Sequence, residues 1–509
     1  VSSPSATEGG DLSFTVSLSN PSTSTTPLTL KLTDGSGTVA GDTTGSVSVS
    51  FDGGVTFTPV TVNPDGTINL VVPANTSSVT LKVPTTDDTI SEGAETIKLT
   101  AGTPANGATP VEGTGTINDN DGTPTLSIEG PVTVNEAAGT LTYTVKLSNP
   151  SATGVTVSYA TQDGTATAGS DYVAKTGSLM FAPGETTKTI TVNVLDDSVF
   201  EGPEAFKVVL SGASGANLAI AEATTTIQDN GTGTTPPGVT PTDDTPKVTG
   251  VSSPSTTEGG ELSFKVDLSN TSLTETPLTL KLTDGSGTVG QDTGTPVSVS
   301  FDGGDNFTTV TVNPDGTINL VVPANTSSVT VKVPTTNDTI SEGAETIKLT
   351  AGTPANGAVP QEGTGTIVDD DGAPQLSIEG PATVNEATGT VTYTVKLSNP
   401  SATSVTVSYA TENAGATAGS DYTPASGSLT FAPGELSKTI TVNVLDDTVF
   451  EGPEAFKVVL SDATGAAIAV SEATTTIQDN GTGTTPPGVT PTDDTPKLSI
   501  EGPVTVNEA

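Results

Sequence analysis

Apolar and polar residues alternate with a period of two along most of this chain. In the segment GTLTYTVKLSN, the odd positions from Leu141 to Leu147 are apolar and the even positions from Thr142 to Lys146 are polar. Such alternation is typical of an antiparallel strand that buries one face. The segments KTITVNVLDD and EAFKVVL follow the same pattern, and no segment has the period of a helix. With Gly and Pro at regular intervals, the pattern predicts an all-β chain of antiparallel, Ig-like sandwiches of about 100 residues each.

The sequence is duplicated at a fixed offset. VSSPSATEGG at Val1 returns as VSSPSTTEGG at Val251, and the register holds without a gap to TTTIQDNGTGTTPPGVTPTDDTPK, which begins at Thr224 and at Thr474. Within each half, TTDDTISEGAETIKL parallels NVLDDSVFEGPEAFKVVL. Repetition of this kind indicates copies of one structural unit. Each half therefore contains two related modules, named here type A and type B.

We therefore divide the chain into modules and linkers. The predicted parts are module A1 (residues 1–121), module B1 (122–230), a Pro/Thr/Gly linker (231–246), module A2 (247–371), module B2 (372–480), a second linker (481–496) and the first strand of a further type B module (497–509). The linkers have no apolar period and are predicted to be extended and semi-stiff, so that stiffness alternates along an elongated array. In type A, the additional stretch from Phe51 to Leu70 alternates around two turn signals and predicts an added hairpin.

The charge of the chain restricts its partners. Lys and Arg number 16 against 58 Asp and Glu, for a net charge of −42, which repels nucleic acid and anionic lipid surfaces. The absence of Cys and His excludes disulfides, thiolate nucleophiles, imidazole bases and the usual zinc ligands. No stretch is long and apolar enough for membrane insertion. The acidic excess indicates a cation as partner, with calcium the first candidate.

The motifs of type B resemble the Calx-beta domain family along its full length. In B1 these motifs are NEA at Glu136, DGTATAGSDY ending at Tyr172, GSLMFAPGE ending at Glu185, the run LDDSVFEGPEAF from Leu195, and the closing TTIQDN. Type A, with its SFDGG and DGT turns, is similar to the longer Ig-like repeats of giant calcium-dependent bacterial adhesins, which include biofilm adhesins. The resemblance implies Ca²⁺ held by acidic loops at one end of each sandwich.

The residues themselves point the same way, because calcium takes six to eight oxygen ligands and these acids lie where strand patterns stop. By motif position, the ligands that the resemblance implies are, in A1, Glu8, Asp42, Asp87, Asp88, Glu92, Glu95, Asp119 and Asp121; in B1, Glu136, Asp171, Asp196, Asp197, Glu201, Glu204 and Asp229; in A2, Glu258, Asp292, Asp338, Glu342, Glu345, Asp369, Asp370 and Asp371; and in B2, Glu386, Asp421, Asp446, Asp447, Glu451, Glu454 and Asp479. The family's closing acidic triplet is Gln-Asp-Asn in both B modules, and Asn337 replaces the acid found at Asp87.

These acids have two other interpretations. Acids at strand ends are often solvated loops, and for Asp42 and Asp292 both interpretations stay open. The linker acids Asp243, Asp244, Asp493 and Asp494 are predicted to be solvated.

Paired carboxylates, as in Glu201 with Glu204 or Asp196 with Asp197, also occur in glycoside hydrolases. A chain with Trp 0, Tyr 6 and Phe 12 has few aromatic platforms for a sugar. We therefore predict that the protein is not an enzyme.

The sequence favours an extracellular or cell-surface location on a bacterium and a role as a calcium-binding structural extender of a repetitive adhesin or matrix protein. Its partners would be calcium and the neighbouring modules. Two alternatives stay open: a self-assembling filament subunit joined by strand exchange, and a calcium sensor. Copied linkers favour the extender or the filament. The segment Leu498 to Ala509 repeats Leu126 to Ala137 and is the strand that exchange between copies would use, although a simple cut from a longer array is the preferred interpretation.

Overall fold

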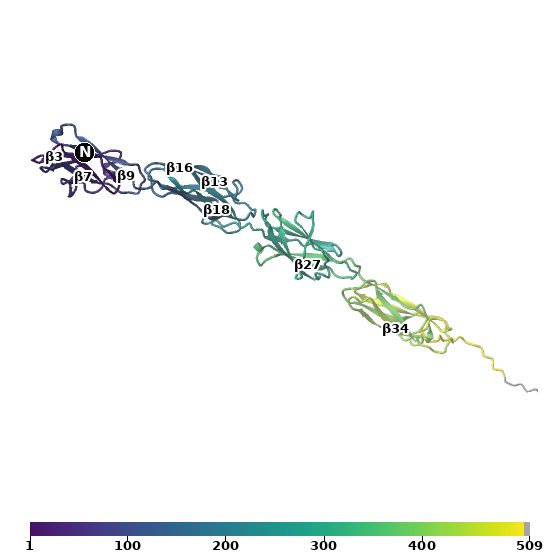
Figure 1. Ribbon diagram of the computed structural model, residues 1–509. Helices are drawn as coiled ribbons and strands as arrows, with labels where there is room; N and C mark the ends of the chain where they lie inside the picture. The colour runs from purple at the N-terminus through teal and green to yellow at the C-terminus, as the bar shows by residue number, and fades with distance from the viewer. Residues whose placement is uncertain (503–509) are drawn as a thin grey trace, which may run out of the picture. The chain divides into compact units, whose positions relative to one another are not determined.

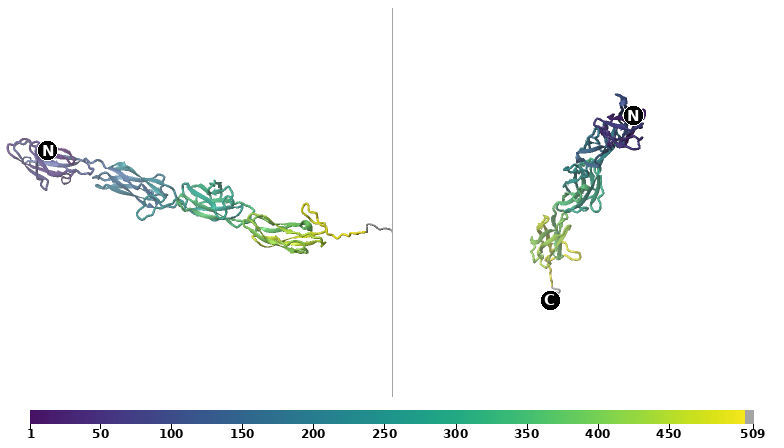
Figure 2. Two further views of the ribbon diagram at one scale, coloured as in Figure 1. Left: turned by 90° about the horizontal axis from the view of Figure 1, so that it is seen from below. Right: turned by 90° about the vertical axis from the view of Figure 1, so that its left-hand side faces the viewer.

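The computed structural model describes residues 1–502 and confirms an all-β chain of tandem β-sandwiches (Figure 1). The chain divides into two compact units, residues 1–245 and the part from residue 246 onward, each with one type A and one type B module. Two further views show the strand-rich modules from other directions (Figure 2), and each module contains two sheets. Most of the predicted strand at 497–509 lies outside the described residues. Among the described residues, no helix has the length and apolar character needed to cross a membrane.

The type A modules pack two sheets together; in A1 a five-stranded sheet faces a four-stranded one of order β2-β7-β4-β5, and in A2 both sheets have five strands. The strands of A1 are β1 (Ser5–Thr7), β2 (Asp11–Ser17), β3 (Thr26–Asp34), β4 (Ser48–Ser50), β5 (Thr58–Pro59), β6 (Thr67–Val72), β7 (Ser78–Pro84), β8 (Glu95–Gly102) and β9 (Val111–Asn118), with helices α1 (Val39–Asp42) and η1 (Pro104–Asn106). Those of A2 are β19 (Val248–Val251), β20 (Ser255–Thr257), β21 (Glu261–Leu268), β22 (Thr276–Asp284), β23 (Ser298–Ser300), β24 (Thr308–Thr309), β25 (Thr317–Val322), β26 (Ser328–Pro334), β27 (Glu345–Gly352) and β28 (Gln361–Val368), with η3 (Pro354–Asn356). In A2, β19 adds an edge strand beside β21.

The type B modules have sheets that in B1 run β11-β18-β16-β13-β14 and β15-β12-β10-β17. The strands of B1 are β10 (Thr125–Glu129), β11 (Thr133–Asn135), β12 (Thr140–Leu147), β13 (Val155–Asp163), β14 (Thr176–Phe181), β15 (Thr187–Asn193), β16 (Glu204–Ser214), β17 (Asn217–Ile220) and β18 (Glu222–Gln228), with η2 (Glu136–Ala138). Those of B2 are β29 (Gln375–Glu379), β30 (Thr383–Asn385), β31 (Thr390–Leu397), β32 (Val405–Asn413), β33 (Ser426–Phe431), β34 (Ser437–Asn443), β35 (Glu454–Thr464), β36 (Ala467–Val470) and β37 (Glu472–Gln478), with η4 (Glu386–Thr388).

In each module, a short strand near the start runs parallel to the last strand. β1 pairs in parallel with β9, from Ser5 opposite Thr116 to Thr7 opposite Asn118, and β11 pairs in the same way with β18. All the other pairs of the five-stranded sheets are antiparallel. This arrangement brings the end of that short strand next to the end of the last strand, at the same end of the sandwich.

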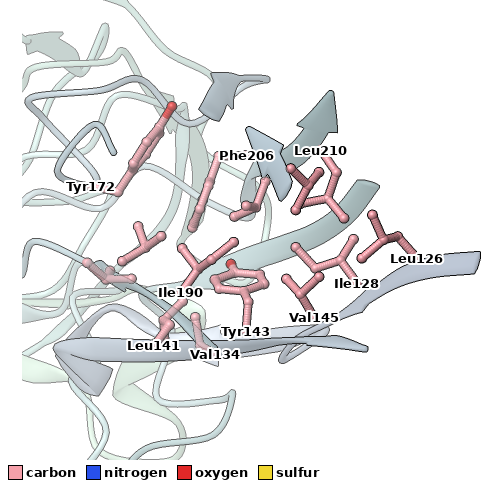
Figure 3. Close-up of a cluster of buried hydrophobic side chains, with 14 of the residues drawn as sticks. Leu126, Ile128, Val134, Leu141, Tyr143, Val145, Tyr172, Ile190, Phe206 and Leu210 are labelled. Carbon is pink, nitrogen blue, oxygen red and sulfur yellow. The ribbon is translucent and has the colours of Figure 1, made fainter. Parts of the chain in front are cut away.

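The core of B1 follows the predicted alternation. The apolar positions of β12 are buried between the sheets, and the intervening positions are mostly exposed. The ring of Phe206 stacks on Tyr172 at 4.2 Å between centroids and meets Tyr143 edge-on at 6.5 Å (Figure 3). The buried Tyr143 hydroxyl lies 2.5 Å from Thr225 Oγ1, so this polar group is satisfied inside the core.

The extra stretch of type A is not one hairpin, so this prediction is wrong. Its first turn does form a hairpin, because β5 pairs with β4. After the second turn, Asn63 to Gly66, the chain crosses to the other sheet, where β6 pairs with β3. β6 buries alternate residues in the core whereas both residues of β5 are exposed, and local alternation could not show that the two strands belong to different sheets.

The predicted extended linker at 231–246 is also not extended. Its Thr234 pairs with Val134 in a parallel bridge, and Asp243 pairs with Asn230 in an antiparallel bridge. Residues 481–496 make the equivalent bridges to B2, Thr484 with Val384 and Asp493 with Asn480. Backbone groups that a solvated linker would leave to water are therefore bonded to the type B module.

Candidate metal centre

Acidic side chains from separate loops gather at one end of each sandwich, called here the acidic pole. In every module, six of the predicted ligands line one cavity. They are Glu8, Asp42, Asp88, Glu92, Glu95 and Asp119 in A1; Glu136, Asp171, Asp197, Glu201, Glu204 and Asp229 in B1; Glu258, Asp292, Asp338, Glu342, Glu345 and Asp369 in A2; and Glu386, Asp421, Asp447, Glu451, Glu454 and Asp479 in B2.

The strand ends explain this convergence. In B1, Glu136 follows β11, Asp197 follows β15, Glu204 begins β16 and Asp229 follows β18. The parallel pairing of β11 with β18 places two of these ends side by side. Asp171 arrives from the loop between β13 and β14, which Tyr172 fastens to Val194 through an antiparallel bridge.

The most compact groups differ between the two types. In B1, single carboxylate oxygens of Asp171, Glu201 and Glu204 all lie within 4.8 Å of one another, and Asp421, Glu451 and Glu454 repeat this in B2.

In A1 the compact group is instead Glu8, Asp88 and Asp121, which Glu258, Asp338 and Asp371 repeat in A2. The most compact group of carboxylates in type A therefore lies near the end of the module, at Asp121 in A1 and at Asp371 in A2.

The remaining predicted ligands lie at the rim of the pole. Asp87 accepts a hydrogen bond of 3.0 Å from Asn120 Nδ2, and Asp196 accepts one of 3.2 Å from Thr242 Oγ1. Asp370 is exposed and acts on Glu258 only through its charge. Asp446 acts in the same way on Glu386.

The carboxylates of the pole raise one another's pKa values. Burial, followed by the nearby Asp171 carboxylate, raises the pKa of Glu201 and of Glu204 to about 7. Burial and a hydrogen bond with Asp244 raise the pKa of Glu136 to about 9. Like charges this close favour a proton or a cation between them.

The surroundings of Asp229 indicate whether the acidic pole can bind a cation. Its side chain is only 3% exposed, and Oδ2 accepts hydrogen bonds of 2.5 Å from the Glu201 amide and 3.1 Å from the Gly202 amide. Its Oδ1 is buried without a hydrogen-bond partner, as is Oδ1 of Asp479 in B2. A buried carboxylate oxygen without a donor is costly unless a cation meets it. Together with five neighbouring carboxylates, this donor set fits the oxygen-only coordination of calcium.

Sequence reasoning missed two residues of the B1 pole. Asn135 is fully buried, and its Nδ2 donates to the carbonyl oxygens of Gln228, Thr232 and Thr242 at 2.9, 3.1 and 3.0 Å. The signal was present, because Asn135 is the first residue of the NEA motif.

Asp244 was predicted to be solvated, and this is wrong, because its carboxyl is hydrogen-bonded to Glu136. Asp494 makes the same bond to Glu386. Their neighbours Asp243 and Asp493 are exposed, as predicted.

Comparisons with known proteins give a family. The Calx-beta domain model matches residues 119–231, 314–371 and 369–481. Sodium/calcium exchanger 1 of Canis lupus familiaris is 53% identical over 57 residues, which are 11% of this chain and 6% of the exchanger. The sodium/calcium exchanger Calx of Drosophila melanogaster is 40% identical over 92 residues, 18% of this chain and 10% of that protein. The chain thus spans at most a tenth of the length of these two relatives.

Solved structures are similar as well. The crystal structure of the apo-form Calx CBD1 domain is 37% identical, covers 21% of this chain and 97% of its own, and has a TM-score of 0.21. A tetra-tandem repeat in the extending region of a large adhesion protein is 12% identical, covers 92% of this chain and 95% of its own, and has a TM-score of 0.31.

Proposed function

Since the chain belongs to the Calx-beta domain family, we propose that its modules bind calcium at their acidic poles and act as an extracellular structural extender of a repetitive surface or matrix protein. The observation that carries this proposal is the convergence of six carboxylates in every module. Calcium needs this kind of site, in which several carboxylates reach one point from separate loops.

In B1, the compact group of Asp171, Glu201 and Glu204 would hold one ion, with Asp229 beside it. A bound ion supplies positive charge that offsets the mutual repulsion of these groups. The chain's own residues position the carboxylates: the Glu201 and Gly202 amides fix Asp229, and the Asp197 carboxylate accepts a hydrogen bond of 2.7 Å from the Val199 amide.

The same geometry argues against glycoside hydrolysis at Glu201 and Glu204. Asp171 shares their site, with ligand atoms of all three side chains within 4.8 Å. A third carboxylate therefore lies within 4.8 Å of both glutamates, in the space beside the pair that an inverting or a retaining hydrolase needs for a sugar ring.

Thermal unfolding of the full chain with calcium and with EDTA tests the calcium proposal. We expect EDTA to lower the melting temperature, because an ion that binds only the native state stabilises it by mass action. A control variant is Glu222→Gln, which removes a carboxylate that pairs with Lys207 on a strand, away from the pole. It should respond to EDTA as the unchanged chain does. Melting that is the same in calcium and in EDTA would exclude calcium as a structural ligand.

A specific observation favours a second candidate, self-association by strand exchange. A1 has a groove of mixed polar and apolar lining beside β2, with Val16, Leu28 and Ala101 among its apolar residues. The counterpart of β2 in A2 is β21, which pairs with β19. The segment from Leu498 has the sequence LSIE of strand β10, and Leu498 and Ile500 are fully exposed. An exposed segment with the sequence of a strand and an open sheet edge can pair between copies.

Light scattering in calcium, with and without residues 497–509, tests this second candidate. Exchange predicts concentration-dependent association that the deletion abolishes. A monomer in both cases excludes it and leaves the extender proposal intact.

A further inference from the structure

The segment that follows each type B module folds back over the acidic pole. We call residues 231–245 of B1 and 481–495 of B2 the strap. In B1, the Gly231 amide donates to the Thr242 carbonyl at 2.8 Å, which closes the strap into a loop. The Asp244 amide then donates to the Asp229 carbonyl at 2.7 Å. The strap thereby ends beside a carboxylate of the pole.

Asn135 fastens the strap from below. Besides donating to the carbonyls of Thr232 and Thr242, its side chain accepts a hydrogen bond of 2.8 Å from the Thr242 amide. The Asn135 amide donates to the Thr234 carbonyl at 3.1 Å. One buried side chain thus holds both limbs of the strap.

The strap brings polar groups into the pole. The Thr242 hydroxyl lies 3.4 Å from Glu136 Oε1 and 3.2 Å from Asp196 Oδ1. The Asp244 carboxyl is hydrogen-bonded to Glu136, which is itself only 6% exposed. Beside them lies the buried Asp229, whose Oδ1 has no partner.

B2 repeats this arrangement with its own residues. The Asp494 amide donates to the Asp479 carbonyl at 2.8 Å, and the Asp494 carboxyl is hydrogen-bonded to Glu386. Oδ1 of Asp479 is likewise buried without a partner.

The strap of B1 supplies a carboxylate that module A1 takes from its own closing triplet. In A1 the closing triplet ends in Asp121, whose carboxylate lies within 4.8 Å of those of Glu8 and Asp88. In B1 the corresponding residues are Asp229, Asn230 and Gly231, so a glycine stands where A1 has Asp121. Asp244 places a carboxylate against Glu136, the counterpart of Glu8.

We propose that Asp244 and Asp494 are calcium ligands, which complete a second ion position in each type B module with Glu136 and Asp229, or with Glu386 and Asp479. This inference rests on the proposed calcium binding. The ion would fasten the strap to the module, so that calcium also determines whether the residues that lead out of the module are held or released.

The test uses the full chain with both copies changed, D244N/D494N, and the matched control D243N/D493N, which removes the same charge from the exposed neighbours. Isothermal titration with calcium measures stoichiometry and affinity, and hydrogen exchange measures protection of residues 231–245 and 481–495. We expect D244N/D494N to lose one binding position per type B module, or to weaken it by about tenfold or more. We also expect calcium to protect the straps of the control but not those of D244N/D494N.

A melting experiment separates a ligand from a merely structural residue. In EDTA, D244N/D494N should melt higher than the unchanged chain, because a charge that opposes the buried Asp229 carboxylate is gone; in calcium it should melt lower. Unchanged stoichiometry, affinity and strap protection in D244N/D494N would overturn this inference while the calcium proposal stands. If the unchanged chain binds no calcium, both fail.

Discussion

At the scale of a single residue, Glu136 shows the free-energy cost of a charged carboxylate in the acidic pole. The side chain is almost fully buried, and its pKa lies near 9, because burial and the Asp244 and Asp196 carboxylates disfavour its charge. Its counterpart Glu386 has a pKa near 8 for the same reasons. A protein without a cation partner would gain stability by losing these charges, so their presence is itself an argument for a ligand.

The pKa shifts predict opposite pH dependences with and without metal. The folded-state pKa of Glu136, about 9, exceeds its ordinary value of 4.5, so the folded chain binds more protons than the unfolded chain between these values. Without metal, the contribution of such groups to the free energy of unfolding is full below about pH 4.5 and is lost as pH rises toward 9. Calcium needs the deprotonated form, so it reverses the slope.

Calorimetry from about pH 5 to about pH 8 checks this prediction. We expect the melting temperature to fall with pH in EDTA and to rise with pH in calcium. The same slope under both conditions would contradict the assignment of these glutamates to an ion site.

Replacement of ligands in one module should leave its duplicate intact. We expect D197A/E201A to abolish the calcium-dependent stabilisation of B1, because two carboxylates of its cavity are lost. B2, with Asp447 and Glu451 in the same places, should keep its calcium-dependent transition. Hydrogen exchange of the two modules in one sample measures both. Equal loss of protection in B1 and B2 would show that the sites are not independent.

At the scale of elements, the loop between β7 and β8 joins the pole of A1 to the next module. The Ser91 amide donates to the Pro150 carbonyl at 2.9 Å, and the Ala152 amide donates back to the Ser91 carbonyl at 3.0 Å. On either side of Ser91 stand Asp88 and Glu92, which line the A1 cavity. Ligands and junction therefore belong to one short loop.

Calcium should accordingly protect the junction. We expect the Ser91 and Ala152 amides to exchange about tenfold or more slowly in calcium than in EDTA, because an ion held by Asp88 and Glu92 restrains the loop between them. Ser341 and Ala402, which are bonded in the same way in the second half, provide an independent repeat. If calcium changes the melting temperature but not the exchange rates of these amides, the proposed coupling between the ion site and the junction is contradicted.

The strands and the ligands could be predicted from the sequence to different depths. The alternation from Leu141 to Leu147 identified both the strand β12 and its buried face, since a period of two is a local property. The strap could not be predicted, because composition shows only Pro, Thr and Gly, whereas its anchor Asn135 lies 107 residues before Thr242. The role of Asp244 depends on that same long-range contact.

At the scale of the whole molecule, a net charge of −42 is distributed unevenly. Lysines pair with glutamates on the strands, as Lys146 does with Glu129 and Lys207 with Glu222. The poles concentrate carboxylates in all four modules. Repulsion in the metal-free protein is therefore strongest at the poles.

Salt should replace calcium only in part. We expect sodium chloride, raised from about 20 to about 200 mM in EDTA, to increase the melting temperature, because it shortens the distance over which the pole carboxylates repel one another. With calcium bound, the same salt should have a smaller effect, since the ions already offset that charge. Equal salt effects under both conditions would mean that calcium does not act at the poles.

The parallel pairing of β1 with β9 determines how a module resists being stretched. A pull along the chain draws β1 backward from its start and β9 forward from its end. Because the two strands run in the same direction, the pull slides them past each other, so their hydrogen bonds must break together, whereas in a hairpin they would open one by one. Glu8 and Asp119 follow directly after these two strands, and the Glu8 amide is bonded to the Asn118 carbonyl at 3.0 Å. An ion held by Glu8 and Asp119 would link the ends of the two strands, at the point where their separation under force must begin. Loss of the ion would therefore lower the mechanical resistance of the module before it unfolds the module in the absence of force.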